Sequence, residues 1–170
     1  MTDSPTPKQR RVLLAVSTSR YSSRLVELAM SEADRMSKDG SAVVIDVLNI
    51  TEGAELDRIS RSVGDEGFLG LDPQKDVLEA LGQEHDRMAR RRVEQVRAAA
   101  AARGIETQVT TVDGRFADVV LEQAERLKSD IILISRADRP FISRILFGSE
   151  ADKVARLARR DGLGKVIIND

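Results

Sequence analysis

The sequence contains no cysteine and no tryptophan, and aromatic residues make up only 3% of the chain. The absence of cysteine excludes disulfides, thiolate metal sites and cysteine nucleophiles, and it is typical of proteins from a reducing compartment. So few aromatic rings offer little surface for stacking nucleic-acid bases. The formal net charge of −1 also lacks the basic excess of a general nucleic-acid binder. We therefore expect no nucleic-acid partner.

Long apolar runs are missing as well. No run approaches the ~20 residues that a membrane-spanning helix needs. The first residues, Met1 to Arg11, are polar and lack the apolar core of a signal peptide. We expect no membrane partner and a cytoplasmic location. Residues 1–10 are predicted to form a disordered tail, and residues 11–170 have a length typical of a single domain.

Short aliphatic runs alternate along the chain with segments of helical periodicity. Runs that predict buried strands lie at residues 11–16, 42–48, 106–112, 131–134 and 165–168. Helices are predicted at residues 25–36, 77–103 and 116–127 and after Gly148. Five strands alternating with four helices predict an α/β fold, a doubly wound five-stranded parallel sheet with helices on both faces. Ligands of such sheets bind beyond the carboxyl ends of the strands, where the strand order reverses.

Residues 53–76 interrupt this alternation and are predicted to form a loop insertion, with a short helix around residues 55–61. The insertion contains an apolar cluster, Phe68-Leu69-Gly70-Leu71. Two interpretations stay open for the cluster, a lid or docking segment and an apolar surface of a mobile loop. The helix that follows the insertion has a possible interruption at Gly82.

The helix at residues 77–103 is rich in arginine, but acidic residues are interleaved with the arginines. This pattern predicts a solvated, ion-paired helix face. His85, the single histidine, has no nearby ligand set and is interpreted as a surface residue. Asp46 and Asp113 lie near strand ends and could hold a cation, although a lone aspartate there more often caps a turn. With no complete catalytic set in the sequence, we do not expect an enzyme.

The segment Asp130–Lys153 organises the chain. It contains a strand of four aliphatic residues, an arginine-rich loop, and then Gly148-Ser149 at the start of a helix. A helix start has unpaired N–H groups and the positive end of the dipole, and glycine lets an anion approach the backbone. Such a layout can hold a phosphate.

The chain resembles the universal stress protein family over nearly all of residues 11–168. The resemblance rests on the order of the elements, on Val112-Asp113-Gly114-Arg115-Phe116-Ala117-Asp118, and above all on Ser143-Arg144-Ile145-Leu146-Phe147-Gly148-Ser149. It implies the same doubly wound fold and a non-enzymatic role in the stress response.

The ATP-binding branch of this family carries a Gly-x-x-Gly pair, nine residues, and then Gly-Ser or Gly-Thr. Aligned on Gly148-Ser149, this pattern places Ser135 and Asp138 where the two earlier glycines belong. A side chain there obstructs the approach of a phosphate to the backbone, and Asp138 adds a negative charge. The resemblance also places Ser17 where nucleotide binders usually have an aspartate, while Val47 keeps the apolar character expected beside a base.

The loop arginines leave two interpretations open. Arg136, Arg139 and Arg144 could hold an anion, or they could pair with Asp138, Glu150 and Asp152 in a closed network, which we favour. The candidate residues of this degenerate nucleotide pocket are Ser17, Val47, Ser135, Arg136, Asp138, Gly148 and Ser149.

The final run, Lys165 to Ile168, is short and apolar. The resemblance implies that it is the edge through which two subunits pair, and an unpaired edge tends to find a partner. The leading hypothesis is a non-enzymatic regulatory homodimer with an unknown protein partner, no cofactor and no ATP binding in the usual mode. The alternative is a nucleotide-responsive module that binds ATP or AMP through a modified phosphate loop.

Overall fold

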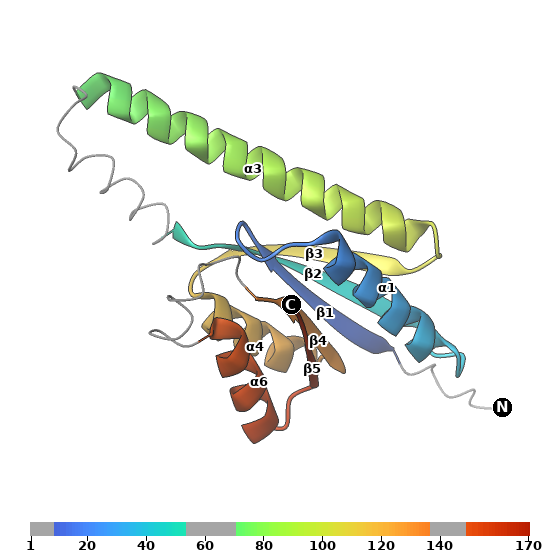
Figure 1. The fold of residues 1–170 in the computed structure, drawn as a ribbon. Coiled ribbons are helices and arrows are strands. Elements are labelled where there is room, and N and C mark those ends of the chain that lie inside the picture. The colour runs from blue at the N-terminus through green and yellow to red at the C-terminus, as the bar shows by residue number, and fades with distance from the viewer. Residues whose placement is uncertain (1–8, 54–70, 137–148) are drawn as a thin grey trace.

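A computed structural model describes residues 9–53, 71–136 and 149–170 of the chain. Five parallel strands form one sheet in the order β3-β2-β1-β4-β5 (Figure 1). The strands are β1 (Arg10–Ser17), β2 (Val43–Thr51), β3 (Glu106–Asp113), β4 (Ile131–Ser135) and β5 (Lys165–Asn169). The described helices are α1 (Ser23–Ser37), α3 (Leu71–Ala101), α4 (Phe116–Leu127) and α6 (Glu150–Arg160). This topology confirms the predicted fold class.

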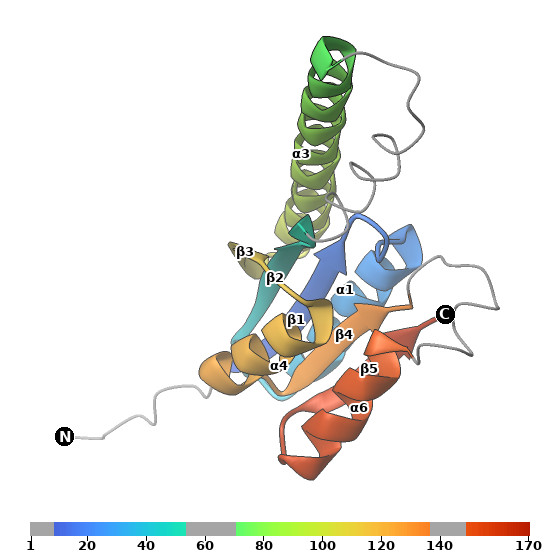
Figure 2. The same ribbon diagram turned by 90° about the vertical axis from the view of Figure 1, so that its left-hand side faces the viewer.

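The helices cover both faces of the sheet, with α1 and α3 on one face and α4 and α6 on the other (Figures 1 and 2). Strand β1 supplies both cores. Its residues Val12, Leu14 and Val16 pack toward α1 and α3, while Leu13 and Ala15 pack toward α4 and α6. Successive side chains of a strand point to opposite faces, so a strand covered on both sides is apolar at nearly every position.

Serine caps begin two of the helices. The Ser22 hydroxyl accepts a hydrogen bond from the Leu25 amide at 3.1 Å, and Ser149 caps α6 in the same manner. Helix α4 ends with Lys128 in the left-handed region, at φ 51°. None of the helices in the described segments is long and apolar enough to cross a membrane.

The strands extend further at their carboxyl ends than the aliphatic runs predicted. The last residue of each strand is polar, because the strand hydrogen bonds continue beyond the aliphatic run. The residues that close β1 to β5 are Ser17, Thr51, Asp113, Ser135 and Asn169. The chain therefore gathers polar groups along one edge of the sheet.

The predicted loop insertion at residues 53–76 is wrong at its end, because Leu71–Asp76 is the first part of α3. Pro73 lies in the first turn, where its missing N–H group costs no hydrogen bond. The helix also continues through Gly82, where a single glycine costs only about 1 kcal/mol. The predicted short helix at residues 55–61, most of the Phe68–Leu71 cluster and most of the tail lie outside the described residues.

Candidate ligand-binding crevice

The strand order reverses between β1 and β4. From β1 the sheet continues through β2 and β3 on one side, and from β4 it continues to β5 on the other. The loops that follow the two strands diverge at such a point and leave a crevice. The polar ends of β1 and β4, Ser17 and Ser135, lie at the base of this crevice. Its two ends differ: one is formed by the start of α6, and the other by the ends of β1 and β2 under α3.

Arg136 dominates the α6 end. Its Nη1 donates to the Asp152 carboxylate at 2.9 Å and to the Ser149 hydroxyl at 3.1 Å, and its Nε donates to the Asp170 carboxylate at 2.6 Å. The hydrogen bond from Arg136 lowers the pKa of Asp152, and the Asp152 and Asp170 carboxylates raise the pKa of Arg136. The guanidinium is thus held by carboxylates at the start of the helix.

The predicted closed network is only partly present among the described residues. Arg136 pairs with Asp152, but Glu150 points to α4, where its carboxylate accepts a hydrogen bond from the Ala117 amide at 3.0 Å. Arg139, Arg144, Asp138 and Gly148 lie outside the described residues. An internal ion pair therefore lies at the start of α6.

Ser135 is buried, and its hydroxyl donates to the Asn169 carbonyl at 3.2 Å. The Asn169 amide group in turn donates to the Ser22 hydroxyl at 2.9 Å. These contacts tie the end of β5 to β4 and to the start of α1. The Ser135 hydroxyl consequently stabilises the sheet and is not directed to a ligand in the crevice.

The other end of the crevice contains a cavity of about 310 Å³ beneath α3. Thr18 and Ser19 follow β1, and residues 49–52 belong to the end of β2. One face of α3 forms the opposite wall through Gly82, His85, Asp86, Ala89 and Arg92. The cavity is open to a small ligand and bears both polar and apolar groups.

Ser17 and Val47, the candidates for this end, do not line the cavity. Val47 is 1% exposed within the core and pairs with Leu14 in the sheet register. Ser17 is equally buried, and its hydroxyl has no hydrogen-bond partner among the residues that the structure describes. The residues that sequence reasoning missed are Ser19 and Asn49, and His85 belongs to the cavity wall rather than to a plain surface. Only the position of α3 over β2 reveals them.

Two arginines fix the walls of this cavity. Arg92 donates to the Ser17 and Thr18 carbonyls at 3.0 and 3.2 Å, and its guanidinium lies 5.0 Å from the centre of the Tyr21 ring. Arg20 is 3% exposed, pairs with Glu52 at 2.9 Å and lies 4.3 Å from the centre of the Phe116 ring.

Elsewhere on α3, the predicted ion pairs are present between Arg87 and Glu84 and between Arg97 and Glu94.

The strand-end aspartates have structural partners. Asp46 makes a two-pronged contact with Arg11 at 2.7 and 2.9 Å, and Asp113 accepts hydrogen bonds from the Thr51 hydroxyl and the Gly53 amide. Asp113 therefore caps a turn. Within the described segments, no group of three or more histidine, aspartate or glutamate residues could hold a metal ion.

Comparisons with known proteins identify the family. A family model described as the universal stress protein family matches residues 8–161. The chain therefore belongs to the universal stress protein family. No curated protein matches the sequence.

Solved structures of low sequence identity share the fold. A universal stress protein in complex with cAMP is 20% identical, with a TM-score of 0.56 over 95% of this chain and 97% of that chain. The hypothetical protein MJ0577 is 14% identical, with a TM-score of 0.64 over 94% of each chain. A universal stress protein family member from Arabidopsis thaliana with AMP bound is 11% identical, with a TM-score of 0.51 over 94% of this chain and 90% of that chain.

Proposed function

We propose that this chain is a non-enzymatic regulatory protein of the stress response that acts as a homodimer and does not bind ATP in the usual mode of its family. The observation that carries the proposal is the position of Arg136. Its contacts with Asp152, Asp170 and Ser149 fill the start of α6, the place where a phosphate would contact the helix. The single histidine and the absence of cysteine support a role without catalysis.

A triphosphate at the start of α6 would meet unfavourable charges. Asp152 lies in the first turn of the helix, and Ser149 already caps the Asp152 amide at 3.4 Å. Two like charges in contact repel by about 4 kcal/mol at an effective dielectric constant near 20. An incoming phosphate would also have to displace Asp152 from Arg136. The sequence places a further acid, Asp138, at a position where ATP binders have glycine.

Charge complementarity supports the homodimer through β5. The two edge strands are β3 and β5. An antiparallel pair of β3 strands would align Glu106 with Asp113 of the other copy, which is unfavourable. An antiparallel pair of β5 strands would align Lys165 with Asn169, next to Asp170.

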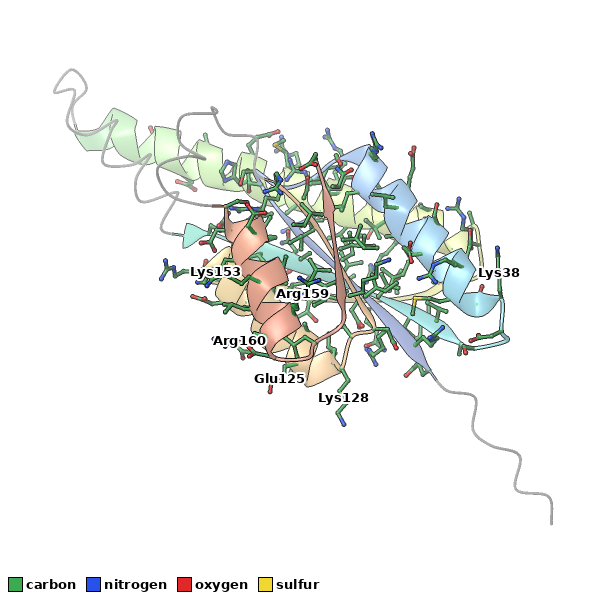
Figure 3. The ribbon with its side chains drawn as sticks, turned by 60° about the horizontal axis from the view of Figure 1, so that its bottom comes forward. Lys38, Glu125, Lys128, Lys153, Arg159 and Arg160 are labelled. Carbon is green, nitrogen blue, oxygen red and sulfur yellow. The ribbon has the colours of Figure 1, made fainter. Side chains whose placement is uncertain are left out.

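A groove of about 700 Å³ between α6 and β5 also suits a second copy. Its floor includes Ala155, Leu163 and Val166, and its cations are Arg156, Arg159 and Lys165. None of these cations has an ion-pair partner in the described part of the chain. Arg159 is an exposed residue of α6 (Figure 3). In an antiparallel pair, the basic end of one α6 would approach the acidic end of the other.

A second candidate function is a nucleotide-responsive module that binds AMP or a similar ligand with few phosphates. The cavity beneath α3 favours this candidate, because it lies away from the Arg136 network and is open to a ligand. Relatives of the same fold have been solved with cAMP and with AMP.

The proposal is tested by calorimetric titration of ATP into the unmodified protein and into Asp152→Asn. We expect weak or no binding to the unmodified protein. Asp152→Asn should raise the affinity for ATP by about tenfold or more, because one negative charge is lost and Arg136 keeps only Asp170 as an ion-pair partner.

The matched control is Asp161→Asn, which removes a carboxylate paired with Arg160 at the opposite end of α6. The control should bind ATP no better than the unmodified protein. An Asp152→Asn protein with unchanged ATP affinity would contradict closure of the site by this carboxylate. Asp138→Gly should shift the affinity in the same direction as Asp152→Asn.

A further inference from the structure

Helix α3 is longer than the sheet that it covers, and its first part extends beyond the sheet (Figures 1 and 2). Its 31 residues span about 46 Å at ~1.5 Å per residue, whereas the nine residues of the neighbouring strand β2 span about 30 Å at ~3.3 Å per residue. Val96 and Ala100, the buried side chains of α3 among the described residues, both lie in its last turns. Core packing therefore accounts for the second half of α3 and not for the first.

The charges of α3 are separated along its length. Residues 71–86 contain five acids and one lysine, and residues 87–101 contain five arginines and one glutamate. Acids at the start and cations at the end of a helix suit its dipole, but that effect is confined to the first and last turns. The ion pairs Arg87–Glu84 and Arg97–Glu94 use one acid from each half. Together these effects leave most of the separation unexplained.

One exposed flank of α3 carries both kinds of charge. Side chains three or four residues apart lie on one side of a helix, and the exposed members of this series are Asp76, Glu79, Gln83, Asp86, Arg90, Glu94 and Arg97. The part from residue 86 to residue 97 borders a groove of about 490 Å³ between α3 and the edge strand β3. Ala89, Val93 and Val109 contribute apolar groups to this groove.

The charged residues of this flank lack partners in their own chain. Asp76, Glu79 and Arg90 have no ion-pair partner within the segments that the structure describes. Asp76 cannot reach Arg90 or Arg97 of the same helix, because these residues lie about 21 and 32 Å further along its axis. Arg97 pairs with Glu94 at 3.2 Å, which also neutralises the glutamate at the groove. The acids of the first half therefore need a cation from elsewhere.

The second half of the same helix is a complementary surface for the first. In a parallel pair of α3 helices acids would face acids, which is unfavourable, whereas in an antiparallel pair the acids of each copy face the arginines of the other. The lengths also agree. Residues 71–81, which precede the cavity-lining Gly82, extend over about 16 Å, and the groove between residues 86 and 97 extends over about 18 Å.

We propose that α3 pairs antiparallel with the α3 of a second copy, so that the first turns of each helix lie along the groove beside β3 of the other. Asp76 and Glu79 of one copy contact Arg90 and Arg97 of the second copy. The contact is related by a twofold axis, so each ion pair forms twice. Exposed ion pairs are weak and screened by salt, and the association is therefore reversible and salt-sensitive.

This contact goes beyond the proposed homodimer and does not depend on it. The groove lies at the β3 edge of the sheet, and β5 forms the opposite edge. Both contacts can therefore form at once, and α3 then joins β5 dimers into larger assemblies. Loss of the α3 contact would leave the β5 dimer in place, and Lys165→Glu tests the β5 contact by itself.

The test is sedimentation equilibrium of the full chain with two charge reversals. Asp76→Arg combined with Glu79→Arg should lower the weight-average mass about twofold or more, because every α3 contact is lost. Arg90→Glu combined with Arg97→Glu should have the same effect. A protein with all four substitutions should recover the mass of the unmodified protein. Recovery cannot arise within one chain, because the two groups lie too far apart on the helix.

Mixing the two reversed proteins gives a second readout. One then has basic residues at all four positions and the other acidic residues, so the mixture should also regain the higher mass. At about 1 M salt, where the Debye length falls to ~3 Å, the unmodified protein should sediment like its reversed variants.

The matched control is Glu122→Arg combined with Glu125→Arg, which reverses two exposed acids of α4. It changes the net charge as much as the reversal of Asp76 and Glu79, and the mass should stay at the unmodified value. Circular dichroism verifies that every variant is folded. An unmodified protein no heavier than its reversed variants would overturn the proposal, as would a four-residue variant and a mixture that both stay at the lower mass.

Discussion

At the scale of single residues, Gly164 sets the position of the last strand. A Cβ atom at this residue would lie 2.2 Å from the Ser129 carbonyl oxygen and 2.8 Å from the Asp130 carbonyl. No backbone atom can yield that much space without a shift of the chain. Glycine is therefore required here for close packing between the start of β5 and the link before β4.

We expect Gly164→Ala to lower the free energy of unfolding by about 3 kcal/mol, the upper part of the range for overpacking. Gly162→Ala is the matched control, because Gly162 has a positive φ of 66° but open space around its Cβ position. Its cost should stay near 1 kcal/mol. Urea denaturation measures both, and equal losses would contradict the steric explanation.

The candidate residues show what a sequence can and cannot predict at this scale. The degenerate motif directed attention to Arg136 and Ser149, which are in contact at the start of α6, since spacing from a strand to a helix start is local information. Asn49 was missed, because it follows an aliphatic run and its place at the cavity depends on α3 lying above it. Val47 suited a base by its apolar character, but the strand extends past it and leaves it in the core.

At the scale of elements, α6 caps α4. The residue before α4, Arg115, provides no side-chain cap, whereas the Glu150 carboxylate from α6 accepts the Ala117 amide at 3.0 Å. A carboxylate at the start of a helix pairs with a free N–H group and suits the helix dipole. The two helices thus depend on each other beyond their apolar contacts.

Glu150→Ala should lower the free energy of unfolding by about 1 kcal/mol, the typical value of a helix cap. Glu125→Ala serves as the control, because Glu125 is exposed on α4 (Figure 3) and should change stability by less than about 0.5 kcal/mol. Thermal or urea unfolding of the two variants is the measurement. Equal effects would show that the contact between the helices contributes nothing.

Element boundaries followed the sequence where local signals were strong. The aliphatic run Ile131–Ile134 predicted β4 to within one residue. The start of α3 was missed because Pro73 and neighbouring glycines resemble a loop, although proline is tolerated in the first turn of a helix. Strand ends were also predicted too early, since apolar content reports the core and not the hydrogen bonds.

At the scale of the whole molecule, the parallel sheet leaves β3 and β5 as edges, and the proposed homodimer uses β5. Lys165→Glu would place an acid opposite the Asn169–Asp170 end of a second copy. We expect the dissociation constant of the dimer to rise at least tenfold, measured by analytical ultracentrifugation. Lys128→Glu, an equal charge change at the end of α4, should leave it unchanged. A monomeric unmodified protein, or an unaffected Lys165→Glu dimer, would contradict this geometry.

The most direct measurement compares the affinities of ATP and adenosine for the unmodified protein by calorimetry, with and without magnesium. If Arg136 and Asp152 close the start of α6, the triphosphate adds nothing to the affinity. ATP then binds no more tightly than adenosine, with or without magnesium. ATP binding in the micromolar range, at least tenfold tighter than adenosine, would contradict the closed phosphate end.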